Sequence, residues 1–560
     1  KDLSASVSVV DQSDFKAISA SNALNLLNYI PGLFVNRTGD FGRADVTIRG
    51  LGERGRKIAV LVDGRPEKMS LFGCIISHSF PLDNVERIEV VRGPASVLYG
   101  SEALGGVINI LTRLPEKEFE TNLDASYGSF DTAQVNLSHG GKRNKFRYLF
   151  TVDRRSSDGH RKNSQYSGNT FTGKVKYEAH DLFNLSFQGK YFDGTKHEAG
   201  TLEYPLYNFW NKYKRGALDL TIQGRGEAFD YQLKFYRNFG RHNFSDGWDS
   251  KDDINGGILR FTTRRFRNNE LTLGADFRKL YGRLYSQPKG EWDKSEAAVF
   301  FQDQLVFKQK WIFSAGFRIH RDSIYGFETS PHGGIVFQVG PKMILRGAVN
   351  KGFRSPQLND LYMYPPSNPD LQPERVWNYE IGFEQDINEN LSLNGTVFRM
   401  QGSNLVELAP NPDGIPPFKF QNTGSFRFYG GEVGLFARIH ANLIGQVFYS
   451  YLDTGELTRG RPGHKFDLSI RYQRKQFSAS LNSQYVADYF ADDFSRLRMP
   501  NYFLLSSRLA YEITSGIELF CDLNNLLDTD YQIYVDLPGL EAGTYPMPGA
   551  AINLGIRVNK

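Results

Sequence analysis

The chain of 560 residues is 40% hydrophobic but 14% aromatic, with a mean hydropathy of -0.44, a combination that suits long strands with one apolar and one polar face better than helices. No run approaches the ~18 apolar residues of a transmembrane helix, which excludes a helical membrane protein but not a membrane β-barrel, whose signal is much weaker per strand. The 67 basic and 62 acidic residues nearly balance, at a net charge of +5, so the composition does not indicate a nucleic-acid binder.

The first hundred or so residues alternate short strands with short helical segments. A helix is expected to open with Ser19 or Ser21 as its N-cap and to end at Pro31-Gly32, and a second helical turn is expected at residues 95–99. Strands are expected at residues 4–10, 33–35, 46–48, 58–62, 87–91 and 106–111. These elements predict a small four- or five-stranded α/β domain that covers residues 1–115.

From Glu120 onward the pattern changes to segments of about ten residues in which apolar and polar side chains alternate. In one such segment, Phe146, Tyr148, Phe150 and Val152 share one face, and Arg147, Thr151 and Asp153 share the other. The apolar faces are rich in Phe and Tyr, as in the aromatic girdles of outer-membrane barrels. The polar faces carry Arg, Lys, Gln and Asp, as a water-filled or plugged lumen would.

The connections between these segments alternate between short and long. Short turns are expected at residues 386–390 and 515–516, and long loops at residues 193–215, 240–256 and 355–376. Short turns at one end and long loops at the other are typical of transmembrane barrels. With roughly 20 residues per strand and connection, residues 120–560 predict ~22 antiparallel strands, a size at which the lumen needs a plug.

A series of motifs along essentially the whole chain resembles the TonB-dependent outer-membrane receptors of the siderophore and vitamin B12 receptor type. The motifs are LLNYIPG (26–32), TIRGLGERG (47–55), VLVDGRP (60–66), VERIEVVRGPASVLYGSEALGGVINILT (85–112), GFRSP (352–356), NPDLQPE (368–374), YEIGFE (379–384), YGGEVGLF (429–436), NNLLDTDY (524–531) and YPMPG (545–549). No single motif is specific, but their order and spacing identify the family. The resemblance implies a membrane all-β fold, in which a ~22-stranded transmembrane β-barrel (120–560) encloses an N-terminal α/β plug domain (1–115).

The resemblance also implies a location, a mechanism and partners. The protein would lie in the bacterial outer membrane among lipids and lipopolysaccharide, and the TonB–ExbB–ExbD complex would pull on its N-terminus to import a small-molecule metal chelate. No intrinsic cofactor, catalytic residue or nucleic-acid partner is expected. Two features depart from the family pattern: no TonB-binding box is recognisable before Leu3, and the chain ends NLGIRVNK without a terminal aromatic residue. Any export signal is expected to have been removed already. For the box, the alternatives are that it was cleaved or that the sequence begins after it; for the C-terminus, they are that the end is trimmed or that this barrel uses a variant signal.

Four charged residues in the family-like motifs are candidates for holding the plug in the barrel. Arg49 and Arg92 stand beside glycines in the plug, and Glu380 and Glu432 stand on predicted barrel strands. Within the family such arginines pair with barrel glutamates inside the lumen. Charge pairs would give the plug a defined position without the permanence of a dry apolar interface. The alternative is that they are ordinary lumen charges facing water.

The loop at residues 67–80 occupies the position of a plug-apex loop that touches ligand in this family, and the long barrel loops are crowded with aromatic residues. Aromatic rings could cup a flat or catecholic ligand, and basic residues could balance its negative charge. The candidate ligand-binding residues are Arg37, Arg43, Arg54, Lys68, Met69, Phe72, Tyr207, Trp210, Trp248, Tyr362 and Tyr364. The alternative for each aromatic residue is a place in an interfacial girdle.

The apex loop also contains three side chains that could bind a soft or borderline metal ion. Met69, Cys74 and His78 lie within ten residues and could hold copper or zinc. The alternative is that Met69 and Cys74 are packing residues and that His78 lies in a turn. The second cysteine, Cys521, is far away in the chain, and the sequence does not show whether the two meet.

We expect TonB-dependent import of a scarce metal chelate, with a ferric siderophore first because it is the family's commonest cargo. The alternatives within the family are a corrinoid, haem, and bare copper or zinc ions. Residues 357–367 contain no histidine, which lowers the case for haem, although Tyr362 or Tyr364 could ligate iron. The alternatives from other classes are a passive porin or adhesin and a barrel-embedded enzyme.

Overall fold

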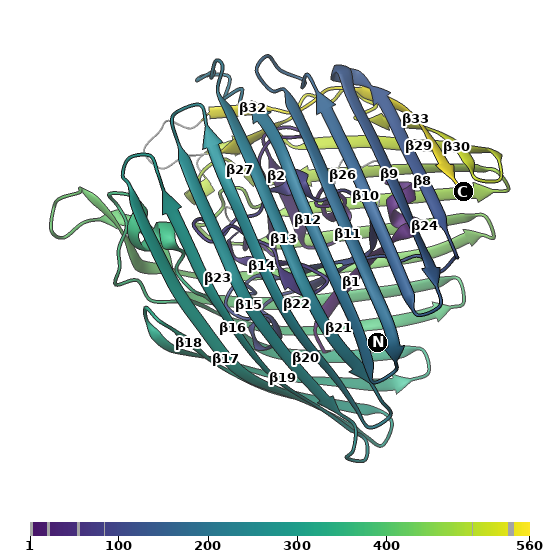
Figure 1. Ribbon diagram of the computed structural model, residues 1–560, viewed down its shortest axis with the longest axis horizontal. Coiled ribbons are helices and arrows are strands. Elements are labelled where there is room, and N and C mark those ends of the chain that lie inside the picture. Colours follow the sequence, from purple (N-terminus) through teal and green to yellow (C-terminus); the bar gives the residue numbers. More distant parts are fainter. Residues whose placement is uncertain (1–3, 19–22, 53–55, 83, 496, 536–542) are drawn as a thin grey trace.

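A computed structural model describes residues 4–18, 23–52, 56–82, 84–495, 497–535 and 543–560 (Figure 1). Twenty-two strands close into one antiparallel barrel. In chain order these strands are β8 (Glu120–Gly128), β9 (Thr132–Arg143), β10 (Phe146–Ser157), β11 (Tyr166–His180), β12 (Phe183–His197), β13 (Trp210–Arg225), β14 (Phe229–Phe244), β15 (Asp249–Thr263), β16 (Asn269–Leu284), β17 (Gly290–Phe307), β18 (Trp311–Asp322), β19 (Gly326–Gly340), β20 (Met343–Arg354), β21 (Glu374–Asn388), β22 (Leu391–Pro410), β23 (Phe418–His440), β24 (Leu443–Asp453), β25 (His464–Arg474), β26 (Phe477–Ala487), β29 (Tyr502–Thr514), β30 (Ile517–Asn524) and β33 (Ala551–Asn559). No helix among the described residues is long and apolar enough to cross a membrane.

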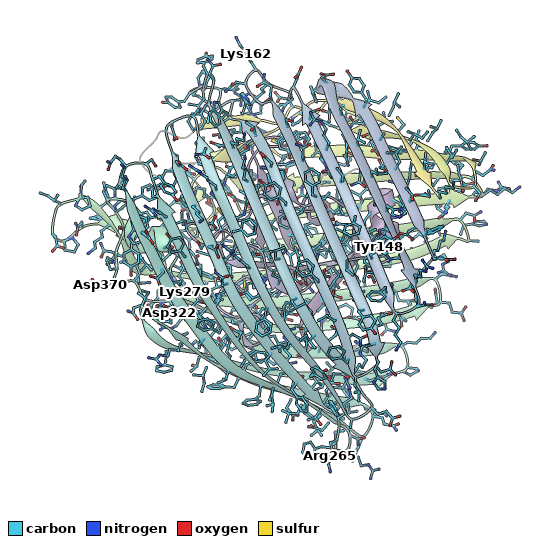
Figure 2. The ribbon with its side chains drawn as sticks, in the orientation of Figure 1. Tyr148, Lys162, Arg265, Lys279, Asp322 and Asp370 are labelled. Atoms are coloured by element: carbon cyan, nitrogen blue, oxygen red, sulfur yellow. The ribbon has the colours of Figure 1, made fainter. Side chains whose placement is uncertain are left out.

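The alternation in the sequence becomes an outer and an inner barrel face. On β10, Phe150 and Val152 are 53% and 44% exposed on the outside, whereas Thr151 and Asp153 are 2% and 3% exposed on the inside. Successive strand residues point to opposite faces, so each strand presents its apolar set to lipid and its polar set to the plug. Figure 2 shows side chains projecting from the strands of the barrel.

The connections are short at one end of the barrel and long at the other. The short end has two- to five-residue turns such as 144–145 and 264–268, and the long end has loops such as 198–209, 355–373 and 525–550. In Figure 2, Arg265 marks the short end. In the same view, Lys162 and Asp370 lie in loops at the opposite end.

Two of the expected long loops are much shorter than predicted. The loop expected at 193–215 spans only 198–209, and the loop expected at 240–256 is the four-residue turn 245–248, because β14 and β15 stay paired up to Asn243 and Asp249. The strands continue past the apolar belt, since the backbone ladder needs no apolar face to form. The expected loop at 355–376 is confirmed as 355–373.

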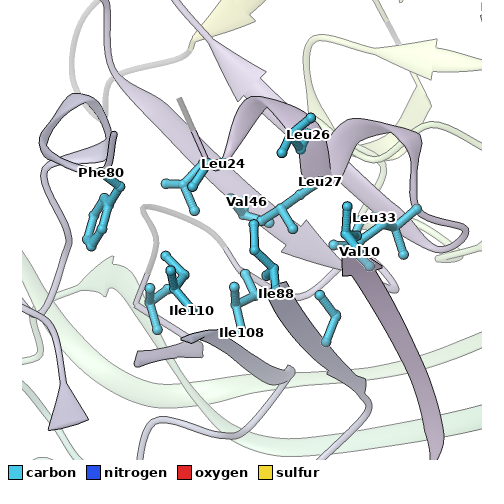
Figure 3. Packing of buried hydrophobic residues seen from close by; sticks show 14 of the residues in the cluster. Val10, Leu24, Leu26, Leu27, Leu33, Val46, Phe80, Ile88, Ile108 and Ile110 are labelled. Atoms are coloured by element: carbon cyan, nitrogen blue, oxygen red, sulfur yellow. The ribbon is translucent and has the colours of Figure 1, made fainter. Parts of the chain in front are cut away.

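The N-terminal region folds into a five-stranded sheet inside the barrel, with strand order β1-β6-β7-β4-β5. The strands are β1 (Ser6–Asp11), β4 (Ile58–Val62), β5 (Arg65–Pro66), β6 (Val85–Arg92) and β7 (Gly106–Thr112), and β2 (Leu33–Arg37) pairs with β3 (Ala44–Ile48) in a separate hairpin. Helix α2 (Ser96–Tyr99) fills the helical turn expected at 95–99. Leucines, isoleucines and valines from β1, β2, β3, β4, β6 and β7 belong to one core (Figure 3).

The helix expected from Ser19 to Pro31 is wrong where the structure describes it. Residues 19–22 lie outside the described residues, and the remainder holds only the 3-10 turn η1 (Asn25–Tyr29), with Leu27 N donating to Leu24 O at 3.1 Å. The tight turn allows leucines close together in sequence to enter the core. A helix that was not predicted, α1 (Gln12–Ala17), follows β1 directly and begins at a capping box formed by Asp11 and Asp14.

Candidate functional site

A tight turn in the plug presents Arg49 to the barrel wall. Ile48 and Leu51 exchange both backbone hydrogen bonds, at 2.7 and 3.0 Å, and the two residues between them have positive φ angles, 51° at Arg49 and 78° at Gly50. Positive φ at both central positions is the signature of a type I′ turn, which is unfavourable for a long side chain such as arginine. The turn therefore holds Arg49 at a backbone cost that its contacts must offset.

The contacts of Arg49 are two buried barrel glutamates. Its Nη1 donates to Glu380 Oε2 at 2.7 Å, and its Nε and Nη2 donate to the two carboxylate oxygens of Glu432 at 2.9 and 3.2 Å. Arg92 Nη1 also donates to Glu432, at 2.7 Å. All four side chains are at most 7% exposed. The predicted docking residues thus meet as two positive and two negative charges.

The pKa values of the two arginines show how well the glutamates compensate each of them. Burial alone lowers the pKa of Arg49, but Glu432 and Glu380 outweigh it, and the net shift is upward. Burial lowers the pKa of Arg92, and Glu432 does not fully compensate. Arg49 is therefore the better-compensated charge of the pair, and Arg92 depends on Glu432 alone for a close carboxylate partner among the described residues.

The same cluster holds the first strand of the plug. Ser6 on β1 donates its backbone N–H and its hydroxyl to Glu380 Oε1 at 3.1 and 3.3 Å, and it lies opposite Arg92 in the β1–β6 ladder. Gly32 passes so close that an added Cβ would lie 2.2 Å from Glu432 Oε1, and its φ of +73° also favours glycine. Glycine at this position lets the plug backbone approach the carboxylate.

Sequence reasoning missed further charged contacts between plug and barrel, and three of them are networks of several side chains. In the first, Arg65 donates to Glu67 at 2.5 Å and to Asp219 on β13 at 3.2 Å. In the second, Glu102 accepts from Lys68 and, at 3.0 Å, from Arg278 on β16. The third network joins Arg56, Lys57, Arg354, Asp360 and Glu374. One feature of the sequence could have indicated these contacts: Arg65 and Glu102 lie inside the family motifs VLVDGRP and SEALGG.

Three of the predicted ligand-binding aromatics gather at the long-loop end of the lumen. Phe72 of the apex loop lies against Trp248, with ring centroids 5.6 Å apart, and Trp248 stacks on Tyr364 at 6.1 Å. Leu71 anchors the apex loop, since it fills the space beside Gly282 that a Cβ would occupy. We refer to Phe72, Trp248 and Tyr364 as the apical aromatic cluster; Tyr362 and Trp292 pack around it.

The other predicted ligand-binding residues do not join this cluster. Lys68 is 5% exposed and paired with Glu102, and Arg43 pairs with Asp45 at 2.8 Å. Arg37 donates to Tyr531 at 3.3 Å. Met69 is buried in the core beneath the apex loop, Tyr207 is 71% exposed in the loop at 198–209, and Trp210 begins β13. Arg54 lies outside the described residues.

The three candidate soft-metal ligands share one apolar neighbourhood. Met69 and Cys74 belong to a core that includes Phe192 and Tyr213, and the ring of His78 lies 5.4 and 6.0 Å from the centroids of those two rings. Burial lowers the pKa of His78 well below its usual range, so the ring is neutral, and burial raises the pKa of the Cys74 thiol. A neutral imidazole suits metal binding, whereas a protonated thiol must lose its proton first.

Among the described residues, one group of histidine, cysteine and carboxylate side chains has its donor atoms within 4.8 Å of one another. This group is Glu296, His320 and Asp322 on β17 and β18. The ammonium of Lys294 lies 3.0 Å from Glu296 and 3.2 Å from Asp322, so a cationic side chain already stands between the two carboxylates. Lys294 therefore pairs with both carboxylates, and the group needs no metal ion to hold them together.

Comparison with known proteins agrees with this geometry. Residues 118–526 match the family model described as TonB dependent receptor-like, beta-barrel, and residues 1–107 match the TonB-dependent Receptor Plug Domain. A plugged barrel of 22 strands with ion pairs between plug and wall defines a gated outer-membrane transporter. The chain belongs to the TonB-dependent receptor family, and it is a protein of the bacterial outer membrane.

The relatives differ in what their names say they carry. The chain is 24% identical to the vitamin B12 transporter BtuB of Vibrio vulnificus, over 94% of this chain and 88% of that protein. It is also 24% identical to an iron-regulated outer membrane virulence protein of Vibrio cholerae, over 94% and 89%. Among solved structures, the unliganded ferric citrate transporter FecA and the copper transporter OprC both superpose with a TM-score of 0.84, at 18% and 16% identity, and cover at least 97% of both chains.

Proposed function

We propose that this protein imports a ferric siderophore across the outer membrane, with energy delivered by the TonB–ExbB–ExbD complex at its N-terminus. The observation that supports a chelate of this kind is the apical aromatic cluster at the long-loop end, where Trp248 stacks on Tyr364 and Phe72 lies tilted against Trp248. Clustered aromatic rings bind the flat faces of catecholate or similar aromatic chelators. Arg56 lies close enough to Tyr364 to affect the ionisation of that phenol, and its guanidinium pairs with Asp360 at 3.0 Å.

A corrinoid is the second candidate, because curated relatives of similar identity include vitamin B12 transporters. Haem is less well supported. Burial raises the pKa of Tyr364 to about 12 and also raises that of Tyr362, so a phenolate ligand for haem iron is disfavoured at neutral pH. Bare copper or zinc would instead use the neighbourhood of Met69, Cys74 and His78.

Energised import is favoured over a passive porin or an adhesin. The plug sheet lies inside the lumen, and buried ion pairs join it to the barrel wall. A plug held in this way blocks free diffusion through the lumen in the resting state. The matched family consists of receptors and transporters, and we assign no catalytic residue and no intrinsic cofactor. The metal of the chelate is cargo.

Tryptophan fluorescence of the purified protein in detergent tests this proposal. The panel contains ferric enterobactin, ferric citrate, cyanocobalamin, haem, Cu²⁺ and Zn²⁺. We expect saturable quenching by a ferric chelate, strongly reduced in Trp248→Phe but retained in Trp311→Phe, whose ring stacks on Phe337 at 3.9 Å at the short-turn end of the barrel. Quenching by Cu²⁺ or Zn²⁺ alone, lost in Cys74→Ser, would contradict the siderophore assignment. Quenching by cyanocobalamin alone would assign a corrinoid.

A further inference from the structure

Three cavities adjoin one another between the plug and one sector of the barrel wall. The upper cavity, of about 30 Å³, and the middle cavity, of about 170 Å³, share the lining residues Asp40, Phe41 and Phe130. The middle cavity and the lower one, of about 390 Å³, share Ser126, Gln134, Arg155 and Asp522. Shared lining residues show that the three cavities adjoin one another in series.

The series runs from the long-loop end of the barrel to the short-turn end. The upper cavity is lined by residues of the loops at 158–165 and 198–209, and the lower cavity is lined by Arg557 and Asn559 near the end of β33 and by residues of α1. Its barrel wall is formed mainly by β8, β9, β10, β29, β30 and β33, which are neighbours in the closed barrel. The series therefore spans the depth of the plug on one side.

The barrel wall of this sector is polar. The inward side chains include Asn122, Asp124, Ser126, Gln134, Asn136, Ser138, Arg508, Asp522 and Arg557. Some of its charges pair within the wall, as Arg508 does with Asp522 at 3.0 Å and Arg557 with Asp124 at 2.7 Å. A wall of amides, hydroxyls and internally paired charges is well hydrated and suits a hydrophilic cargo of either sign.

Most of the described ion pairs that fasten the plug to barrel strands lie in other sectors. They join Asp63 to β11, Glu67 to β12, Arg65 to β13, Glu102 to β16, Arg49 to β21 and β23, and Asp14 to β25. In the cavity sector, Arg113 pairs with Glu120 at the start of β8, where the chain passes from the plug to the barrel. Beyond that junction, contacts beside the cavities include the hydrogen bond from Asn28 to Gln484 at 3.2 Å. Hydrogen bonds between neutral groups are weaker than charge-assisted ones, so beyond the Arg113 junction the plug is expected to separate from this sector first.

Part of the plug wall of the lower cavity is a segment close to the N-terminus. Gln12, Phe15 and Lys16 of α1 line the cavity, and α1 follows directly from β1, which lies at the edge of the plug sheet beside β6. An edge strand can be peeled away one ladder bond at a time. Traction on β1 would draw α1 out of the lower cavity and enlarge it, against the ion pair of Asp14 with Arg471.

We propose that the transported chelate crosses the barrel along this sector, between the plug and strands β8, β9, β10, β29, β30 and β33, and that displacement of β1 and α1 opens its lower end. The resting middle and upper cavities, of about 170 and 30 Å³, are smaller than the ~300 Å³ or more of a typical small-molecule site, so they hold water and the plug must move before a chelate passes. The proposal rests on the proposed import function.

Two matched cysteine variants test the route. Gln134→Cys places a thiol on β9 where the middle and lower cavities meet, and Gln446→Cys places one on β24 in a separate cavity of about 220 Å³ that shares no barrel residue with the series. Both are made in a background with Cys74→Ser and Cys521→Ser. Each is compared with itself before and after modification by a bulky maleimide, with radiolabelled ferric enterobactin and cyanocobalamin as uptake probes.

Modification of Gln134→Cys is expected to reduce uptake to the level of cells without proton-motive force while surface binding of the probe persists, and modified Gln446→Cys is expected to keep its uptake. Full modification of Gln134→Cys without loss of uptake, or equal loss in both variants, would overturn the route. If the wild type imports neither probe, the proposed function fails for those chelates. Labelling rates in porin-deficient cells then decide the route: faster labelling of Gln134→Cys in energised cells supports it, and no effect of energisation overturns it.

Discussion

Loss of the two barrel glutamates that hold Arg49 should loosen the plug without unfolding the barrel. The double substitution Glu380→Gln with Glu432→Gln keeps the size of both side chains but leaves Arg49 and Arg92 buried without a carboxylate from this cluster. Removing one partner of a buried ion pair costs about 3–5 kcal/mol. Here the loss falls on contacts between two domains, because Arg49 and Arg92 belong to the plug and both glutamates to the barrel.

That energy converts into a large shift in the docking equilibrium. At about 1.4 kcal/mol per tenfold change, even the lower figure changes the ratio of docked to loosened plug by at least about a hundredfold. The neutral amides can still accept hydrogen bonds from the arginines, which offsets part of the lost docking free energy. The other ion pairs of the plug, such as that of Arg65 with Asp219, remain, so we expect transient loosening and not release.

The assay is the entry of vancomycin into cells that lack TonB, together with limited proteolysis of the plug in the purified protein. The variant should admit the antibiotic and lose plug protection, while heat-modifiable migration of the barrel is unchanged. The matched control is Glu384→Gln on the same strand as Glu380, because Glu384 pairs with Arg346 of the barrel at 2.6 Å. Unchanged antibiotic entry and unchanged protease resistance in the double variant would refute a docking role for these charges.

Three further outcomes are expected. Gly32→Ala should expose the plug to protease more than Gly64→Ala, because both have positive φ but only at Gly32 would the new Cβ meet Glu432, at 2.2 Å; equal sensitivity would contradict this. Burial alone raises the pKa of Glu67, but its lysine and arginine neighbours bring it to about 2, so its stabilising effect is present above pH 4.5 and lost as the pH falls towards 2. Pepsin digestion across that range should therefore show a steeper loss of plug protection in the wild type than in Glu67→Gln. Phe72→Ala should weaken binding of the quenching chelate by roughly tenfold in the fluorescence titration, by loss of about 0.5–1.5 kcal/mol of ring contact plus buried area, and an unchanged affinity would remove Phe72 from the site.

Local pattern predicts most of the barrel from the sequence. A strand such as β10 shows its two faces in every pair of residues, because successive side chains point to opposite sides whatever the rest of the chain does. The ends of strands are less visible: the sequence predicts a long loop at residues 240–256, whereas the structure has the turn 245–248 and keeps Arg241, His242 and Asn243 in β14. They are in strand because β15 lies alongside and completes their hydrogen bonds.

The short plug helices show the same limit. The segment with Leu24 and Leu27 has the composition of a helix. It forms a 3-10 turn instead, because this turn lets both leucines pack into the plug core. Helix α1 was overlooked because six residues are too few for a periodic pattern, although the capping pair Asp11 and Asp14 was visible. Propensity decides little in segments this short, where tertiary contacts dominate.

The candidate site divides in a similar way. The sequence by itself determined the class of the molecule and which residues are unusual: arginines beside glycines in the plug, glutamates on predicted barrel strands, and aromatics in loops. Only the tertiary structure decided that Arg49 meets Glu380 and Glu432, which are 331 and 383 residues away, that Lys68 pairs with Glu102, and that Phe72 lies against Trp248. The physical reason is that a barrel brings distant strands around one lumen, so the partner of a buried charge is set by the closure of the sheet and by the seating of the plug, neither of which leaves a trace in local sequence.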